Sequence, residues 1–533
     1  MLKRSLLLAA TAAAFLSATA LGAGAATVRY ANQGDLKSLD PYTLNETTTN
    51  AHLGNVYEGL TSRGKDLAIG PGLAERWEML EGGKRWMFYL RKGVKFHNGN
   101  DFTADDVLFS ADRVRAQGSN FLTRVPKDAK FTKVDDYTVE VTLPTPNPIM
   151  HYQWDTWYIM DKEWAEQNNA TAPTPASAQT PGHAALNTNG TGPFRIESHQ
   201  PGVRTVFKAN PTWWNDAKKE HNITEVIFTP IGNDATRVAA LLSGEVDIIE
   251  PVPIQDIARI NASPNARTLT GPEVRTIFLS FDQVRDELLS SNVKGKNPFK
   301  DKRVREAFYK AIDIETIKSR VMRNLATPSA LMIAPEFFPL SKEFTRPKYD
   351  PDGAKKLLAE AGYPNGFEVG MNCPTDRYVN DGEICQAAVG MLARVGIKIN
   401  PIFEPKAQYF AKVLKAGGYQ TSFYLLGWTP GTGDPHNVLY DIMGCRDNPQ
   451  STRGESNLGG YCNKKLDELT DKILVEADAS KRTGMIAEAF KIGNEDFGYI
   501  PLHQQALAWG VSKKFSIPQR ADNEILFYWA RKE

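Results

Sequence analysis

One arginine stands directly after a predicted strand, where its chemistry could serve ligand binding. Residues Glu368–Asn372 are predicted to form that strand, and Arg377 follows in the segment CPTDRYVND. In α/β folds the ligand crevice opens at the carboxyl ends of the strands, and a planar guanidinium can bind a carboxylate through two charge-assisted hydrogen bonds. We therefore expect Arg377 to bind an anionic group, unless it pairs with Asp376 or Asp381.

A second loop with polar and aromatic side chains follows the predicted strand Ser422–Leu426. It runs from residue 427 to 437 with the sequence GWTPGTGDPHN. Trp428 could pack on ligand side chains or fill the core. Asp434 could satisfy backbone N–H groups in a turn ahead of Pro435, and the resemblance described below gives it a second possible role. His436 is a further candidate for ligand contact.

Motifs of several common enzyme classes are absent from the sequence. We find no GxSxG, HExxH, Walker loop or Rossmann fingerprint, and the eight histidines are scattered along the chain. We therefore predict a protein that is not an enzyme and has no cofactor. A secreted peptide hydrolase is the alternative from another class, because active-site residues are brought together by the fold rather than by local sequence.

Four cysteines predict two disulfides in an exported chain. Cys373 and Cys385 are 12 residues apart and Cys445 and Cys462 are 17 apart, so sequential pairing is the simplest of the three possible connectivities. A metal site is the alternative, but the sequence has no CxxC and no histidine at ligand spacing beside these residues.

The N-terminus predicts export. Lys3 and Arg4 precede an apolar run, and small residues then end at Ala25 and Ala26, which is the order of a secretory signal peptide. We predict cleavage after Ala25 or Ala26 and a freely diffusing periplasmic protein. No cysteine follows the predicted cleavage point to accept a lipid.

The charge of the predicted mature chain is nearly balanced. Of 63 basic residues, two lie in the signal peptide, which leaves 61 basic residues against 62 acidic ones. This balance gives no reason to expect nucleic acid or an anionic membrane as partner. The length of 533 residues allows two or more domains with substantial cores.

The order of the predicted elements indicates an α/β fold. Residues Arg85–Arg91 alternate as a strand, and Thr103 is placed to cap a following helix. Glu225–Pro230, Asp234–Ser243 and Val246–Ile249 predict a strand, a helix and a strand, which is a βαβ crossover. Strands and longer helices then alternate to the end of the chain. Residues 168–189, rich in Ala, Thr and Pro, predict a mobile surface insertion.

The stretch from Gly72 to Val114 resembles the signature of the periplasmic solute-binding proteins that feed peptide and nickel ABC importers. This resemblance covers essentially the whole predicted mature chain. It implies two lobes joined by two crossing strands, with a smaller domain inserted in the first lobe. After the signal peptide (1–26), the implied boundaries are 27–60, 188–272 and 501–533 for the first lobe, 61–187 for the inserted domain and 273–500 for the second lobe.

The resemblance also assigns roles to particular residues. Arg377 matches an arginine that pairs with the terminal carboxylate of the ligand in dipeptide-binding relatives. Where those relatives carry an aspartate for the free amine, this chain has Gly431, so that anchor is missing unless Asp434 replaces it. The loop before the first helix touches the ligand in relatives, which makes candidates of three further residues: Leu39, Asp40 and Tyr42. A turn at Asp40 is the alternative.

These observations predict the monomeric receptor of an ABC importer, which captures a peptide or peptide-like anionic solute between two lobes and delivers it to an inner-membrane permease with cytoplasmic ATPases. Lobe closure would bury the solute. A receptor for a metal chelate, haem or an opine is the alternative of the same class, and His436 would then be the residue to test.

Overall fold

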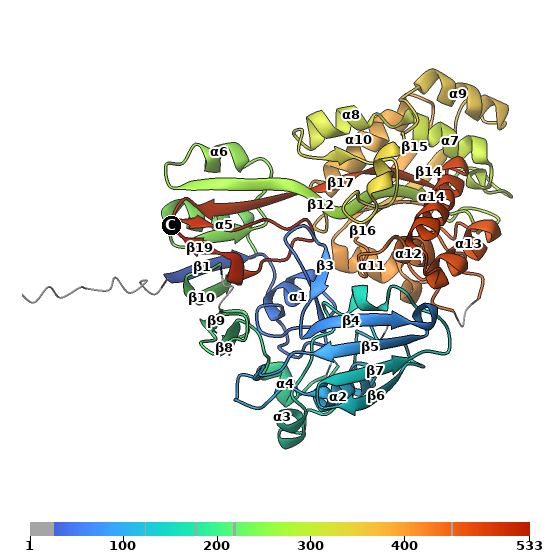
Figure 1. Cartoon of the computed structure of the whole chain (residues 1–533). Helices are drawn as coiled ribbons and strands as arrows, with labels where there is room; N and C mark the ends of the chain where they lie inside the picture. Colours follow the sequence, from blue (N-terminus) through green and yellow to red (C-terminus); the bar gives the residue numbers. More distant parts are fainter. Residues whose placement is uncertain (1–25, 123, 176–177, 217–219, 449–450) are drawn as a thin grey trace, which may run out of the picture.

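The protein consists of two lobes that are joined by two long strands (Figure 1). This computed structural model describes residues 26–533 except 123, 176–177, 217–219 and 449–450. Strands β12 (Ala266–Phe281) and β17 (Tyr499–Ser512) pair antiparallel and run from one lobe into the other. The predicted two-lobed α/β fold is confirmed.

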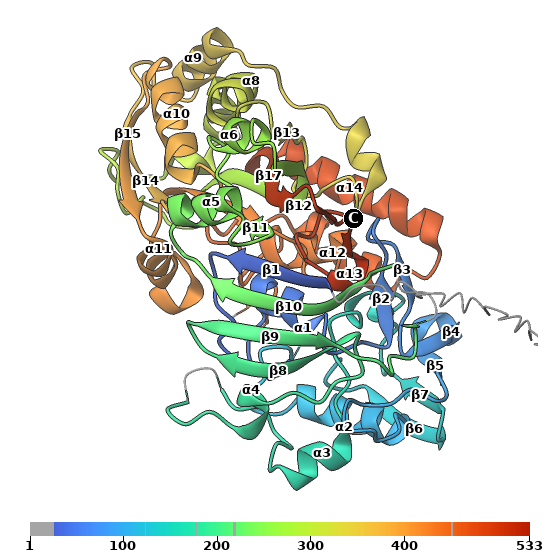
Figure 2. The same ribbon diagram turned by 90° about the vertical axis from the view of Figure 1, so that its left-hand side faces the viewer.

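Both lobes share one large sheet, with β12 and β17 in its middle. The strand order is β15-β14-β16-β12-β17-β11-β1-β10-β9-β8, and β13 pairs with β17 off this path. The strands on the first-lobe side are β1 (Ala26–Asn32), β8 (Phe194–Gln200), β9 (Arg204–Ala209), β10 (Ile223–Pro230) and β11 (Ile248–Glu250). The first-lobe helices are α1 (Thr47–Leu53), α5 (Asp234–Ser243) and α6 (Ile257–Asn261). Figure 2 shows this side of the sheet.

The predicted βαβ crossover is present in the first lobe. Strands β10 and β11 both pair in parallel with β1, which lies between them. Helix α5 connects them: Asn233 accepts a hydrogen bond from the N–H of Thr236 at its start, and Gly244 ends it with φ 79°. Glycine adopts this left-handed conformation without steric cost, so the chain can turn back into the sheet.

The inserted domain has a four-stranded antiparallel sheet of order β4-β5-β7-β6. Its core strand β5 buries Trp86, Phe88 and Leu90 as the alternation predicts, and Thr103 with Asp106 forms a capping box at the start of α2. The strands here are β2 (Thr61–Arg63), β3 (Ile69–Pro71), β4 (Ala74–Leu80), β5 (Arg85–Leu90), β6 (Lys130–Asp135) and β7 (Thr138–Thr142). The helices are α2 (Ala104–Val114), α3 (Lys162–Gln167) and α4 (His183–Leu186).

This inserted domain shares one continuous apolar core with the first lobe. The segment 168–189, which the sequence predicts to be mobile, is packed at both ends of its described part: Ala170 is buried, and Asn189 donates to Asp161 over 2.8 Å. Between these ends most described residues are exposed, so the predicted surface position is confirmed, and the mobility of the segment stays a prediction.

The second lobe contains the remaining strands and the longer helices. Its strands are β13 (Thr327–Pro328), β14 (Glu368–Pro374), β15 (Lys398–Glu404) and β16 (Phe423–Trp428). Its helices are α7 (Lys302–Ala311), α8 (Ile314–Thr316), α9 (Pro351–Glu360), α10 (Asp381–Ala393), α11 (Lys406–Val413), α12 (Pro435–Asn437), α13 (Lys464–Val475) and α14 (Ala479–Glu495). Two short strands near the C-terminus, β18 (Phe515–Ser516) and β19 (Arg531–Lys532), pair with each other. Among the described residues, no helix is both long and apolar enough to cross a bilayer.

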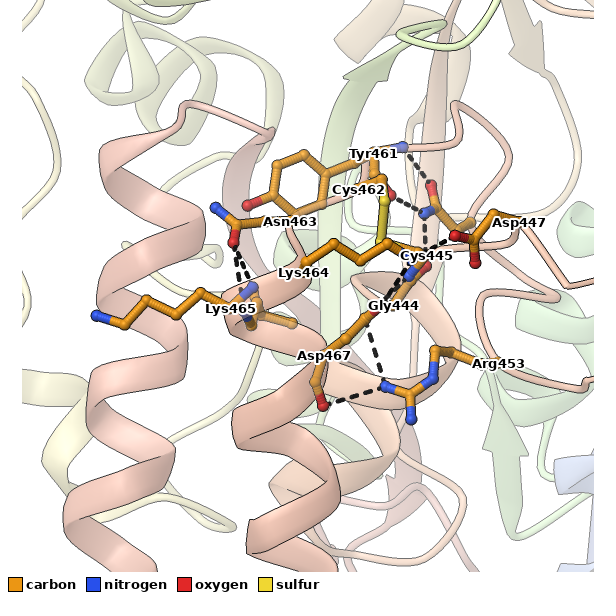
Figure 3. The surroundings of a disulfide bond; sticks show 12 residues. Gly444, Cys445, Asp447, Arg453, Tyr461, Cys462, Asn463, Lys464, Lys465 and Asp467 are labelled. Carbon is orange, nitrogen blue, oxygen red and sulfur yellow. Dashed lines mark hydrogen bonds and ion pairs between the residues drawn. A yellow bond between two sulfur atoms is a disulfide. The ribbon is translucent and has the colours of Figure 1, made fainter.

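Both predicted disulfides form with sequential pairing. Cys373–Cys385 joins the end of β14 to α10. Cys445–Cys462 lies before α13 (Figure 3), where the backbone N–H of Cys445 donates to Asp467 over 3.1 Å. Because all four cysteines are paired, the alternative of a cysteine metal site is excluded.

Candidate functional site

The loops that carry the candidate residues lie side by side at one edge of the second-lobe sheet. Strands β14 and β16 are parallel neighbours, with Met371 paired to Phe423 and Asn372 to Tyr424. Parallel strands end at the same edge, so the segment after β14 and the loop 427–437 after β16 meet there. The hydroxyl of Tyr378 donates to the carbonyl of Gly427 over 3.3 Å and joins the two segments.

Arg377 is held in place by the start of helix α10. The carboxylate of Asp381 accepts hydrogen bonds from the backbone N–H groups of Arg377 (2.9 Å) and Tyr378 (3.0 Å). The disulfide Cys373–Cys385 closes the chain on both sides of this turn. Asp381 therefore binds the backbone of Arg377 and not its guanidinium. The alternative, in which Asp381 pairs with the guanidinium, is wrong.

The guanidinium of Arg377 is unpaired with any anionic group of the described chain. No hydrogen bond or ion pair to it exists among the described residues, and its contact is with the ring of Tyr378, 5.1 Å from the guanidinium carbon. Desolvation by its surroundings and the neighbouring charge of Arg275 lower the pKa of Arg377, although the residue keeps access to solvent. The charge of Glu46, at the start of α1 in the first lobe, acts in the opposite sense. Arg377 is thus a cation without an ion pair among the described residues, and it interacts electrostatically with Glu46 of the opposite lobe.

Two charged residues of the crossing strand β12 complete this cluster. Arg275 lies 3.2 Å from the carboxylate of Glu273 and donates to the hydroxyl of Thr429 over 3.1 Å. Glu273 also accepts from Gln505 of β17 over 2.6 Å, and burial raises the pKa of Glu273. The pairing of β12 with β17 is irregular between Pro272 and Thr276. Such an irregularity re-aims side chains, and here Arg275 is neutralised by Glu273 while Arg377 is not.

Sequence reasoning missed Glu273, Arg275 and Gln505. A signal was present in the sequence. Glu273 and Arg275 are charged residues two apart at the start of the largely apolar segment EVRTIFLSF. Charged side chains on one face of a buried strand require partners or a ligand. The sequence could not show that β17 would supply Gln505.

The two lobes meet where loop 427–437 contacts the inserted domain and its neighbours. Arg124 donates to the carbonyl of Gly431 over 2.9 Å, and Arg63 donates to the carbonyl of Thr432 over 3.2 Å. At Gly433 a Cβ atom would lie 2.6 Å from a terminal nitrogen of Arg63, and φ is 62°. Glycine is therefore needed at this close approach.

A cavity of about 530 Å³ lies beside this contact, between the inserted domain and the second lobe. Its walls include Arg63, Tyr152, Glu336, Phe337 and Arg482. A smaller cavity of about 240 Å³ lies between the first lobe and the inserted domain and contains none of the predicted site residues. The cavity of about 530 Å³ has walls from both halves of the molecule, but Arg377, Trp428 and Gly431 do not line it.

Asp434 lines the larger cavity, but both its oxygens are already bound. Arg482 of α14 donates to them over 2.7 and 2.8 Å, and the N–H of His436 donates over 2.8 Å. His436 is half-buried and stacks on Tyr440 with 5.5 Å between ring centroids. Burial lowers the pKa of His436 to about 4. The indole of Trp428 donates to Asn437 over 2.9 Å and packs against a second-lobe core cluster.

The three candidates near the N-terminus lie in the interior of the part formed by the first lobe and the inserted domain. Leu39, Asp40 and Tyr42 are all buried. Asp40 forms a two-bond ion pair with Arg113 at 2.9 and 2.6 Å, and the hydroxyl of Tyr42 donates to the carbonyl of Tyr158 over 2.5 Å. The structure thus places Arg377, Trp428 and Gly431 on two neighbouring segments, while Asp40 and Tyr42 have their partners in the inserted domain.

Comparison with known proteins places this architecture in a family. Residues 68–450 match the model of the bacterial extracellular solute-binding proteins, family 5. The dipeptide-binding protein of Escherichia coli K12 is 28% identical over 497 residues, covering 87% of this chain and 86% of that protein. Heme-binding protein A of Haemophilus influenzae is 28% identical over 481 residues, covering 86% of this chain and 83% of that protein. The structure of HbpA2 from Haemophilus parasuis has a TM-score of 0.79 at 25% identity, covering 95% of this chain and 100% of that one. The chain belongs to family 5 of the bacterial extracellular solute-binding proteins.

Proposed function

We propose that this protein is the periplasmic receptor of an ABC importer, and that it captures a peptide or peptide-like anionic solute between its lobes. The observation that carries this proposal is the guanidinium of Arg377, which has no anionic partner among the described residues and stands at the carboxyl end of β14. Arg377 is exposed, so a solute can reach its guanidinium, which can bind a carboxylate through charge-assisted hydrogen bonds. A solute carboxylate is the counter-ion that we assign to it.

The two-lobed shape supports capture by closure. The chain passes between the lobes through the crossing strands β12 and β17 (Figure 1), and closure around a solute would bury most of its surface. A permease in the inner membrane would then take the solute from a monomeric receptor. Export through removal of residues 1–26 belongs to the same proposal, and residues 1–25 lie outside the described part of the chain.

The related proteins that bind a dipeptide and heme leave the nature of the solute open between a peptide and a chelate. We favour a peptide-like solute because Arg377 offers a carboxylate clamp, whereas His436 is half-buried with a pKa of about 4. A haem, metal chelate or opine receptor stays the alternative. Native mass spectrometry of protein purified from its own host, followed by fragmentation of the released solute, would separate a peptide from these.

The test of the clamp is a set of variants titrated with that released solute. We expect Arg377→Ala to weaken binding about 10- to 150-fold, the equivalent of losing one charged hydrogen-bonded contact of about 1.5–3 kcal/mol. Arg377→Lys should recover part of this loss, because it restores charge but not the fork. Arg394→Ala, an exposed position at the end of α10, is the control. Equal affinity of Arg377→Ala and wild type would refute the clamp.

A further inference from the structure

Arg124 is a buried cation without an ion pair to any residue that the structure describes. Its residue is 6% exposed, and no ion pair to its guanidinium is present in the described part of the chain. One terminal nitrogen donates to the carbonyl of Gly431, and the guanidinium carbon lies 5.5 Å from the ring centroid of Phe121. The Nε atom is buried and has no hydrogen-bond partner among the described residues. The charge of Asp155, which Arg63 binds, acts on Arg124 without forming an ion pair with it. A buried charge without an ion pair is costly, so this group has unused capacity to bind an anion.

The guanidinium of Arg124 faces open space at Gly431. A Cβ atom built on Gly431 would lie 3.8 and 4.0 Å from the two terminal nitrogens of Arg124, with no other atom within 4 Å. The backbone of Gly431 is not in the left-handed region, so its conformation does not require glycine. An oxygen-bearing group in this space would meet both ends of the guanidinium fork.

Arg124 and Arg377 lie on opposite walls of the opening between the lobes. Arg124 lies four residues after Asn120 in the inserted domain. The N–H of Asn120 donates to the carbonyl of Tyr42 over 2.9 Å, so this segment is packed against the first lobe. The charge of Glu46 in turn acts on Arg377. Tyr378, next to Arg377, binds Gly427, and Arg124 binds Gly431. Gly427 and Gly431 are four residues apart and their main chain spans at most about 14 Å, so both contacts are made to one short loop.

We propose that Arg124 forms a second anion subsite, and that the solute carries two anionic groups, one for Arg377 and one for Arg124, with no free amine at the second end. This inference rests on the proposed capture of an anionic solute at Arg377. An ordinary dipeptide would bring its ammonium group toward Arg124, where like charges repel. A dicarboxylate such as an N-succinylated amino acid or peptide has the required chemistry.

The first experiment needs no solute. Gly431→Asp places a carboxylate in the open space, and Gly431→Asn places an amide of the same shape there. We expect the Asp variant to unfold at a higher urea concentration than the Asn variant, because its carboxylate pairs with Arg124. In an Arg124→Gln background this difference should disappear. Equal midpoints for the Asp and Asn variants with Arg124 present would overturn the subsite.

The second experiment uses the solute released from wild-type protein purified from its host, with N-succinyl-alanine and alanyl-alanine as defined probes. Methyl esterification should add two groups to the released solute and acetylation none; one ester and one acetyl group would overturn the inference. N-succinyl-alanine should bind more tightly than alanyl-alanine, and Arg124→Gln should reverse or abolish that preference.

The same titrations separate this inference from the proposed function. Loss of binding in Arg377→Ala with full retention in Arg124→Gln would refute the second subsite and leave the receptor reading intact. Loss in Arg124→Gln with full retention in Arg377→Ala would refute the clamp at Arg377. Losses of about 10- to 150-fold in both variants are the expected result.

Discussion

The disulfide Cys373–Cys385 should matter for binding as well as for stability, whereas Cys445–Cys462 should matter for stability alone. The two bridges close loops of 12 and 17 residues in sequence separation. In the chain-entropy model both contribute about 3 kcal/mol, with a difference of only a few tenths. Replacing each pair by two alanines should therefore lower the free energy of unfolding by similar amounts, which urea denaturation can measure.

Affinity should distinguish the two variants. The first bridge encloses Arg377 and Tyr378, while the second lies at α13 (Figure 3). Without the first bridge, the Arg377 turn keeps the hydrogen bonds of Asp381 but gains backbone freedom. Reordering one residue costs about 1–2 kcal/mol, so we expect binding to weaken about 5- to 30-fold.

Calorimetric titration of both variants at a temperature where both are folded gives the answer. The Cys445–Cys462 variant is the matched control and should bind like wild type. If both variants lose affinity equally, or if the Cys373–Cys385 variant loses stability with no change in affinity, then Arg377 is not positioned by its disulfide and the reasoning fails.

Two further predictions concern Asp434, which is buried, and Glu58, which is half-buried. Asp434→Asn should lower the free energy of unfolding by about 3–5 kcal/mol, because it removes the partner of the half-buried Arg482; urea unfolding measures this, and a stability like wild type with a large loss of affinity would instead favour Asp434 as a solute anchor. Burial raises the pKa of Glu58 to about 7. The folded state therefore binds more protons than the unfolded state between about pH 4.5 and 7. The free energy of unfolding falls as pH rises through that window, by about 3 kcal/mol from this group. Glu58→Gln should flatten this part of the pH profile of unfolding, and an unchanged slope would contradict the shift.

Much of the fold could be predicted from the sequence because its signals are local. The capping box at Thr103, the glycine stop at Gly244 and the alternation in β5 are each written within a few residues. The rule that ligands bind at strand ends predicts Arg377 and the loop 427–437 as separate candidates. The two disulfides needed only the assumption of export and the simplest pairing.

The electrostatic state of each candidate could not be read in the same way. Asp40 and Asp434 look like available carboxylates in the sequence, but their partners Arg113 and Arg482 are 73 and 48 residues away. Arg124 lies in an irregular segment with no period to mark it as buried. Which charges are paired and which are free depends on long-range contacts, and these decide which residues are left for a solute.

The contact between the lobes at loop 427–437 is made to its main chain. Arg63 and Arg124 donate to the carbonyls of Thr432 and Gly431, not to their side chains. A mutation at position 431 or 432 can therefore alter what the loop offers a solute while the carbonyls that join the lobes persist. During evolution, the solute that is bound can then change while the contact between the lobes is kept. New specificities could then arise in a receptor of this kind by single substitutions.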